Sequence, residues 1–253
     1  MQKHIAGVLA ALVLVPSLAV AQTPEERASA RALVAKFGDA VVTVLGTAKV
    51  RINQGGREVQ NRDERIQATA TMLDGSGLSV MSLASIDPSD VIMANAARAN
   101  RPGAPPVSVT VESSDLRYRM ADGREVPARV VLRDKDLDMA FLRPVEQLSA
   151  PVVALGTESV RPQPVDLLVI LQRLPEIAGW QAMAAFATVQ AIVEKPRTFY
   201  LVTSGAFGAP VFDTGGRFVG VVLRLRNDTG EGPTAPPIVL PATDIREVAK
   251  QAT

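Results

Sequence analysis

The side chains that usually carry proton transfer and nucleophilic attack are almost missing from this chain. Its only histidine is His4, and it contains no cysteine. Histidine is the usual proton carrier near neutral pH, because its unperturbed pKa is about 6.5. Without cysteine there is no thiolate to act as a nucleophile or to bind a soft metal ion. If His4 is lost, most hydrolase mechanisms are excluded.

His4 lies in a segment, residues 1–21, that has the pattern of a signal peptide. A positively charged start precedes the apolar run Ile5–Val15, and the small residues Ala19 and Ala21 precede the expected cleavage point. The run is shorter than the roughly 18–20 apolar residues of a spanning helix. We therefore expect a bacterial protein that is exported to the periplasm or secreted and has no imidazole once mature. Retention of the segment as an anchor is the alternative.

The charge balance gives no reason to expect a nucleic-acid partner. The chain has 27 Lys and Arg against 26 Asp and Glu, and loss of the leader removes Lys3, which leaves a formal charge near zero. A hydrophobic content of 47% is ample for a core without disulfides. No cysteine is available for a lipid anchor, so we expect no stable membrane insertion after cleavage.

Apart from its two ends, the mature chain has the pattern of a β protein. Thr23 and Glu26 form a capping-box pattern before a helix over 24–37, and a closing helix is expected over 244–251. The polar segment 51–67, with two central glycines, is typical of an exposed hairpin, and 95–106 has the composition of a loop. Short strands are expected at 40–45, 68–72, 78–82, 107–111, 116–120, 125–132, 139–143, 165–171, 185–193, 198–202, 210–212, 218–225 and 238–240.

Many short strands separated by turns favour an all-β sandwich or barrel over alternating strands and helices. Pro144–Pro151 is the expected seam between two halves. We therefore expect one domain over 22–147, containing the N-terminal helix, and another over 148–253, containing the C-terminal helix.

Five stretches carry motifs in a fixed order: Met72–Ala84, Tyr118–Arg143, Leu155–Ile170, Gly205–Pro210 and Phe212–Gly220. In this order they resemble the protease domain of trypsin-like serine proteases of the bacterial HtrA/Deg type. The resemblance covers roughly residues 38–250. It implies an all-β fold of two packed six-stranded antiparallel β-barrels with short N-terminal and C-terminal helices. The PDZ modules that often follow this domain are not expected here.

The resemblance implies a degenerate catalytic triad. Ala84 stands where the family has its histidine, Asp138 at the aspartate, and Phe207 where the family has its nucleophilic serine. The serine hydroxyl attacks because the imidazole takes its proton, whereas the carboxylate only orients that imidazole. Loss of either the serine or the histidine costs on the order of a million-fold in rate. Asp138 alone therefore has no catalytic task.

The resemblance also places an oxyanion hole at the backbone N–H groups of Gly205 and Phe207. These donors survive a change of side chain in principle. The Phe207 benzyl group, however, is expected to project into the space that a substrate carbonyl needs. Ala209 replaces a glycine of the family motif, which alters the backbone freedom of the loop.

Other interpretations of these residues stay open. Asp138 can simply accept local hydrogen bonds. The segment 134–138 mimics the start of a calcium loop, but Met139 and Val145 replace its required glycine and glutamate. Ser204 can be a displaced nucleophile served by a lysine, although no lysine lies nearby in sequence. We expect no metal ion and no cofactor.

The sequence leaves three alternative functions open. The first is a catalytically inactive, exported relative of HtrA-type proteases that binds a peptide or a partner protein. The second is an active serine endopeptidase with displaced catalytic residues, and the third is a structural component of an envelope or extracellular assembly. For the first, an extended peptide is expected to add to an exposed edge strand, made of Thr188, Val189, Gln190, Ala191, Ile192 and Val193.

Overall fold

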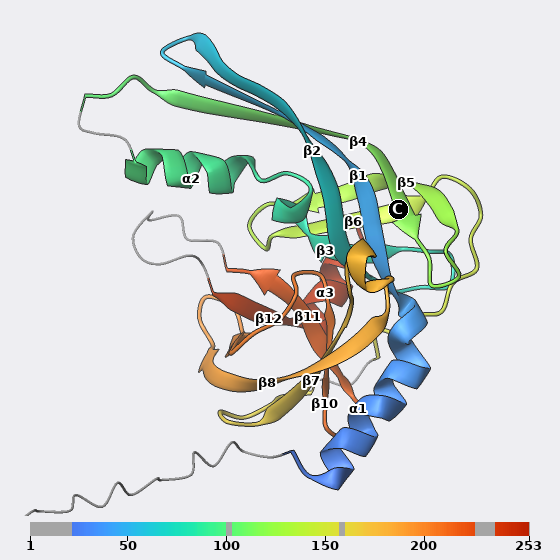
Figure 1. The fold of residues 1–253 in the computed structure, drawn as a ribbon. Helices are drawn as coiled ribbons and strands as arrows, with labels where there is room; N and C mark the ends of the chain where they lie inside the picture. The colour runs from blue at the N-terminus through green and yellow to red at the C-terminus, as the bar shows by residue number, and fades with distance from the viewer. Residues whose placement is uncertain (1–21, 100–102, 157–159, 226–235, 253) are drawn as a thin grey trace, which may run out of the picture.

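The computed structural model describes residues 22–99, 103–156, 160–225 and 236–252, which form two closed antiparallel β-barrels (Figure 1). The first barrel has the strand order β1-β2-β3-β6-β5-β4 and the second β10-β11-β12-β9-β8-β7. The predicted fold of two six-stranded barrels is therefore confirmed. The strands are β1 Val41–Gln54, β2 Arg57–Met72, β3 Ser79–Ser82, β4 Val107–Arg119, β5 Glu125–Asp134, β6 Met139–Pro144, β7 Leu167–Arg173, β8 Ala182–Val193, β9 Phe199–Val202, β10 Pro210–Asp213, β11 Phe218–Arg224 and β12 Pro237–Pro241.

The predicted terminal helices are both present, as α1 (Pro24–Phe37) and α3 (Ala242–Ala249). Thr23 Oγ1 accepts from the Glu26 N–H at 3.1 Å, and Glu26 Oε2 accepts from the Thr23 N–H at 2.7 Å. This is the capping box that the sequence predicted. Three short 3-10 helices, Gly38–Ala40, Leu83–Ser85 and Glu176–Ala178, are also present.

Helix α1 packs against strands of the second barrel (Figure 1). The ring of Phe37, the last residue of α1, stacks on Phe212 of β10 with centroids 4.9 Å apart. The Ser29 hydroxyl donates to the Thr214 carbonyl at 2.7 Å. Because β1 starts directly after this helix, α1 joins the start of the first barrel to the second.

A third α-helix, α2 (Ser89–Ala99), was not predicted, and it includes part of the segment interpreted as a loop. None of its described residues is fully buried. It lies beside β4 (Figure 1). The Ser113 hydroxyl of β4 donates to the Ile86 carbonyl in the segment that leads into the helix.

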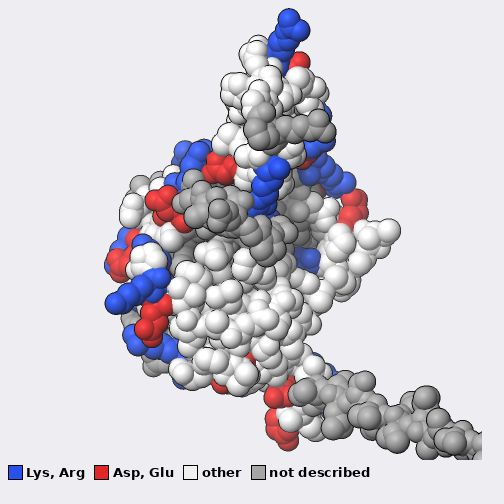
Figure 2. Space-filling view, turned by 90° about the vertical axis from the view of Figure 1, so that its left-hand side faces the viewer, with Lys and Arg blue, Asp and Glu red and all other residues white. Residues whose placement is uncertain are grey.

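Strands β1, β2 and β4 extend beyond the first barrel as a three-stranded sheet (Figures 1 and 2). The predicted hairpin is present, and its turn places Gly55 at φ 59° and Gly56 at φ 81°. The sequence predicted two separate strands at 107–111 and 116–120, but β4 is continuous. The pairing register between β4 and β1 shifts near Asp115, whose φ is 53°. Aspartate tolerates this left-handed conformation better than most residues.

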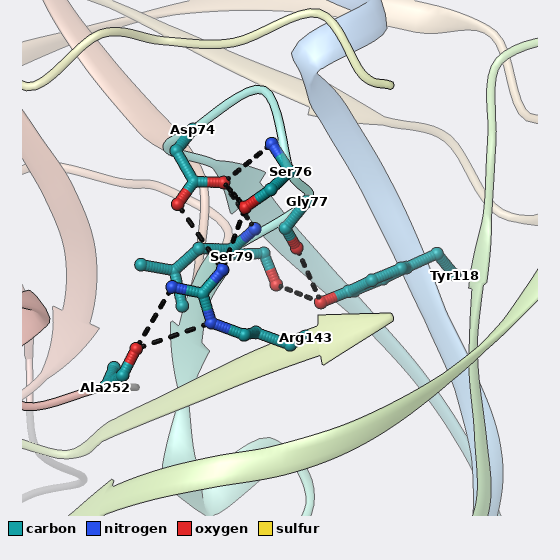
Figure 3. A network of polar contacts seen from close by, with 8 residues as sticks. Asp74, Ser76, Gly77, Ser79, Tyr118, Arg143 and Ala252 are labelled. Carbon is teal, nitrogen blue, oxygen red and sulfur yellow. Dashed lines mark hydrogen bonds and ion pairs between the residues drawn. The ribbon is translucent and has the colours of Figure 1, made fainter. Parts of the chain in front are cut away.

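A polar network inside the first barrel fixes the loop before β3 (Figure 3). The buried Tyr118 hydroxyl donates to the Gly77 carbonyl at 3.2 Å and lies 2.9 Å from the Ser79 hydroxyl. Burial raises the pKa of Tyr118, so this hydroxyl stays protonated. Arg143 donates to Ser76 Oγ at 2.9 Å and to the Ala252 carbonyl at 3.2 Å, which ties the segment after α3 to the first barrel.

The edge expected at Thr188–Val193 is paired on both sides only at its start. Thr188 pairs with Leu167 of β7, and Val189 pairs with Val202 of β9. Pairing with β9 continues to Val193. The register with β7 ends at Thr188, so residues 190–193 pair on one side only among the described strands. For these residues the expected edge stays a prediction.

No helix of the described residues is long and apolar enough to cross a membrane.

The two barrels meet closely at Gly208, in the loop before β10. The Thr71 hydroxyl of β2 donates to the Gly208 carbonyl at 2.8 Å and is buried. Gly208 has a φ of 88°, and a Cβ added there would lie 2.0 Å from the Thr69 carbonyl oxygen. Only glycine fits both the conformation and the space.

We predict that Gly208→Ala lowers the free energy of unfolding by about 3 kcal/mol or more, since it combines backbone strain with a backbone clash. Gly56→Ala is the matched control, because Gly56 also has a positive φ of 81° but would meet nothing within 4 Å. It should cost only about 1 kcal/mol. Urea unfolding followed by circular dichroism measures both. Equal losses would show that the contact with Thr69 is unimportant.

Candidate functional site

Asp138 is a buried carboxylate at the junction of the two barrels. It ends the turn between β5 and β6 and is only 7% exposed. The turn is fixed by the Asp134 carboxylate, which accepts from the Leu137 N–H at 3.0 Å. Asp138 itself has a φ of 55°, again the left-handed conformation that aspartate and asparagine tolerate.

Three donors from both barrels satisfy this carboxylate. The Ser82 hydroxyl at the end of β3 donates to Oδ2 at 2.5 Å, and the Ala84 N–H donates to Oδ1 at 2.8 Å. The Arg224 N–H at the end of β11 donates to Oδ2 at 3.0 Å. The Asp138 carbonyl also accepts from the Leu83 N–H at 2.9 Å. Asp138 therefore binds the 3-10 helix Leu83–Ser85 and links it to the second barrel.

Burial raises the pKa of Asp138 above its ordinary value of 3.8. The hydrogen bonds from Ser82, Ala84 and Arg224, together with the positive charge of Arg224, oppose this effect. The cost of removing the carboxylate from water is the largest of these contributions. A charged carboxylate is therefore unfavourable at this position unless hydrogen-bond donors surround its oxygen atoms.

The structure brings Ala84 and Asp138 together and places Phe207 next to Arg224. Ala84 contributes its backbone N–H to Asp138, while its side chain is a methyl group without chemistry. The Phe207 ring packs against the core of the second barrel. The guanidinium carbon of Arg224 lies 4.7 Å from the centre of that ring, in a cation–π contact.

The sequence analysis did not identify Arg224 or Ser82. Ser82 is fully buried at the end of the short strand β3, and the sequence did not distinguish it from Ser79 of the same strand, which is also buried. Arg224 also had no signal, because an arginine at a strand end is usually solvated. In the structure its Nε is buried and has no hydrogen-bond partner among the described residues.

The backbone N–H groups of Gly205 and Phe207 make no hydrogen bond with other described residues. The next residues of the loop are anchored: the Gly208 N–H donates to the Val222 carbonyl at 2.7 Å, and the Val222 N–H donates to the Ala209 carbonyl at 2.9 Å. A Cβ on Gly205 would lie 2.9 Å from the Val222 side chain. The loop is therefore held in one position by strand β11.

Ser204, the alternative nucleophile, is exposed and forms no hydrogen bond to a lysine within the described ranges. The segment 134–138 uses Asp134 and Asp138 for hydrogen bonds inside the protein. Among the residues that the structure describes, no cluster of three or more histidine, cysteine, aspartate or glutamate side chains is placed to hold a metal ion.

A cavity of about 480 Å³ lies beside Arg224 at the junction of the barrels. Its apolar walls come from both barrels, and charged side chains of both signs also line it. The lining residues are Asp134, Asp136, Leu137, Lys195, Pro196, Arg197, Phe199, Arg224, Leu225, Ile238 and Leu240. An apolar surface with charged groups around it suits a ligand that has both kinds of surface, such as a peptide.

The chemistry that this arrangement supports is limited. A guanidinium stays protonated in proteins and has no lone pair to accept a proton, so Arg224 cannot act as a general base. Phe207 offers no nucleophile, and Asp138 is already engaged by three donors. The described site therefore provides positioned charge and apolar surface, but no pair of nucleophile and base.

Comparisons with known proteins agree with the architecture. The family model described as "Trypsin-like peptidase domain" matches residues 75–221, more than half of the chain. Among solved structures, 397 chains match. One of them is described as "HtrA-type protease AlgWS227A with decapeptide"; it is 14% identical, with a TM-score of 0.59. No curated protein matches the sequence.

That structural match covers 87% of this chain but 65% of the other, so this chain spans less than two thirds of its length. At this identity the likeness concerns the fold. Together with the family model it confirms the resemblance to trypsin-like proteases that was inferred from the motifs.

We predict that Asp138→Asn lowers the free energy of unfolding by about 1–3 kcal/mol at neutral pH. Asparagine tolerates the positive φ, but one of its two side-chain groups is an NH₂ donor instead of an acceptor. This group would face the Ser82 hydroxyl or one of the two backbone N–H groups, which are themselves donors. Asp136→Asn, at an exposed position, is the matched control and should change little. Urea unfolding measures both variants. An unchanged stability for Asp138→Asn would mean that the carboxylate does not hold the barrels together.

The pKa of Asp138 also predicts a pH dependence. Because burial raises this pKa in the folded state, the native protein retains a proton that the unfolded chain releases as the pH rises above 3.8. The stability of the wild type relative to Asp138→Asn should therefore fall as the pH rises through the raised folded pKa, by up to about 1.4 kcal/mol per pH unit, and then stay constant. Unfolding at a series of pH values tests the sign. A relative stability that grows with pH would show that hydrogen bonds and Arg224 outweigh burial.

Proposed function

We propose that this chain, which belongs to the family of trypsin-like peptidase domains, is an exported and catalytically inactive member that binds peptides or partner proteins. The observation that carries the proposal is the contact between Arg224 and Phe207 beside Asp138. Phe207 stands where the resemblance expects the nucleophilic serine, and the Arg224 guanidinium over its ring has no lone pair to take a proton.

The sequence supports the loss of chemistry independently of geometry. Residues 22–253 contain no histidine, and the chain contains no cysteine. A rearranged triad would therefore need an unusual base, such as lysine. Ser204, the serine nearest to the loop in sequence, lies exposed and without such a partner among the described residues.

We expect no activity from the mature protein. Purified residues 22–253 should neither cleave unfolded casein nor be labelled by a fluorophosphonate probe, with an active trypsin-like protease as positive control. Labelling of any serine would overturn the proposal and favour an endopeptidase with displaced catalytic residues.

The double variant Ala84→His with Phe207→Ser should also stay inactive, since Arg224 still lies beside the new serine. Its charge would disfavour an imidazolium next to Asp138. The comparison is the triple variant that adds Arg224→Ser, with circular dichroism to confirm folding in both. Casein cleavage above background by the double variant would show that Arg224 is no obstacle.

The binding role rests on the cavity beside Arg224. Its apolar walls can accept a side chain, and its charged residues can pair with those of a peptide. The solved relative with a decapeptide gives a precedent for a peptide ligand on this fold. Peptide addition at Thr188–Val193 stays a separate prediction, because only residues 190–193 have an edge that no described strand pairs.

Leu137→Glu tests the cavity, because it places a charge in an apolar wall. A fluorescent library of random decapeptides should bind the wild type with saturation, and Leu137→Glu should lower the affinity by tenfold or more. Val145→Glu is the matched control: Val145 is 62% exposed and does not line the cavity. If no peptide binds the wild type, a structural role in an assembly becomes the better explanation.

A further inference from the structure

Gln22 has a special place in the chain if the leader is removed where the sequence predicts. Loss of residues 1–21, which lie outside the described residues, would make Gln22 the first residue. A glutamine at the start of a chain carries its own electrophile, because the carbon of its side-chain amide can reach the α-amine of the same residue in a five-membered ring. The chemistry at Gln22 therefore rests on the export proposed above and on no other part of the proposed function.

The structure leaves Gln22 free to react. Gln22 is exposed, and only Thr23 separates it from Pro24, the first residue of α1. Its side chain forms no hydrogen bond with another described residue. In Figure 1 the first turn of α1 lies at the margin of the molecule. Neither packing nor hydrogen bonding to the described residues therefore holds the Gln22 amide away from the backbone nitrogen of the same residue.

The reaction available to a free Gln22 is closure of a five-membered lactam, pyroglutamate. The α-amine has an ordinary pKa of about 7.7–8.0, so part of it is unprotonated at neutral pH and can attack the side-chain Cδ. The new bond between the backbone nitrogen and Cδ replaces the bond between Cδ and Nε2. One ammonia leaves, and it carries away the proton that the amine gives up. No oxidant, metal ion or second substrate is needed.

The ring is compatible with the folded start of α1. The Thr23 N–H donates to Glu26 Oε2 at 2.7 Å, and the Glu26 N–H donates to Thr23 Oγ1 at 3.1 Å. Ring closure changes none of these atoms, and it keeps the carbonyl of Gln22 and the peptide bond to Thr23. The capping box therefore stays as it is in the structure.

A free amine at Gln22 would bring the helix cap within reach of aminopeptidases. Removal of Gln22 would make Thr23 the chain end, and the peptide bond that restricts the φ of this N-cap residue, −65° in the structure, would be lost. Helix α1 contacts the second barrel through Phe37 and Ser29, so this start belongs to the element that joins the two barrels. A lactam offers no free amine to such an enzyme.

We propose that Gln22 is a modification site, at which the α-amine and the side-chain amide close to pyroglutamate once residues 1–21 have been removed. The ring blocks the N-terminus one residue before the cap of α1. It also removes an α-ammonium from the end of the helix where the macrodipole disfavours positive charge. The site is separate from the cavity beside Arg224, so peptide binding there does not depend on the ring.

The intact mass of the exported protein gives a direct test. The full-length chain is expressed with its own leader in a bacterium, purified from the periplasm and analysed by mass spectrometry. We expect the mass of residues 22–253 less one ammonia, with the loss located at Gln22 by fragmentation of the N-terminal peptide. An unmodified Gln22 overturns cyclisation and leaves export in place. Retention of residues 1–21, or cleavage at another bond, overturns both.

Gln22→Asn is the matched control, because its side chain is one methylene shorter and the same attack would have to close a strained four-membered ring. Released from a cleavable fusion so that residue 22 comes first, the wild type should lose one ammonia on storage near neutral pH, whereas Gln22→Asn should keep its full mass. This comparison does not depend on what happens to the leader in the cell.

Resistance to an aminopeptidase tests the consequence of the ring. A broad-specificity aminopeptidase should leave the stored wild type unchanged and should remove residue 22 from Gln22→Asn, with circular dichroism to confirm that both proteins are folded. Equal removal of residue 22 from the two proteins would overturn the proposed block.

Discussion

The position of one buried carboxylate organises the centre of this molecule. Asp138 belongs to the first barrel, yet it accepts hydrogen bonds from Ser82, from Ala84 and from Arg224 of the second barrel. A charge in so dry a place is tolerated only when several donors surround it. The end of β3, the turn before β6 and the end of β11 must therefore meet at one point, and the loop with Phe207 lies beside that point.

Under the proposed loss of catalysis, the same geometry explains how a peptidase fold can persist without peptidase chemistry. Asp138 links the two barrels by hydrogen bonds whether or not an imidazole lies beside it. Phe207 adds apolar surface to the core of the second barrel, and the Arg224 guanidinium lies over its ring. Selection for stability alone would retain these residues. In the proposed inactive site, buried apolar area, hydrogen bonds and one cation–π contact stabilise the junction of the barrels.

The parts of the fold that depend on local pattern could be predicted from the sequence. The capping box of α1, the hairpin around Gly55 and Gly56 and the positions of most strands appear as expected. The helix α2 was missed because the Ala, Arg, Pro and Gly content of 95–106 was interpreted as a loop, whereas α2 ends within that segment. The pairing of Thr188 and Val189 between β7 and β9 was not predicted, since barrel closure depends on strands far apart in sequence. Arg224 was missed for the same reason: its neighbours Asp138 and Phe207 come from other segments.

The contact between Phe207 and Arg224 bears on how this chain can evolve. Ala84, Phe207 and Arg224 lie on three different segments. Under the loss of catalysis proposed above, reversal of one of these residues would leave the other two in place, so a single substitution would not restore hydrolysis. Such a lineage would be free to diversify its surfaces, whereas a return to hydrolysis would need several changes at once.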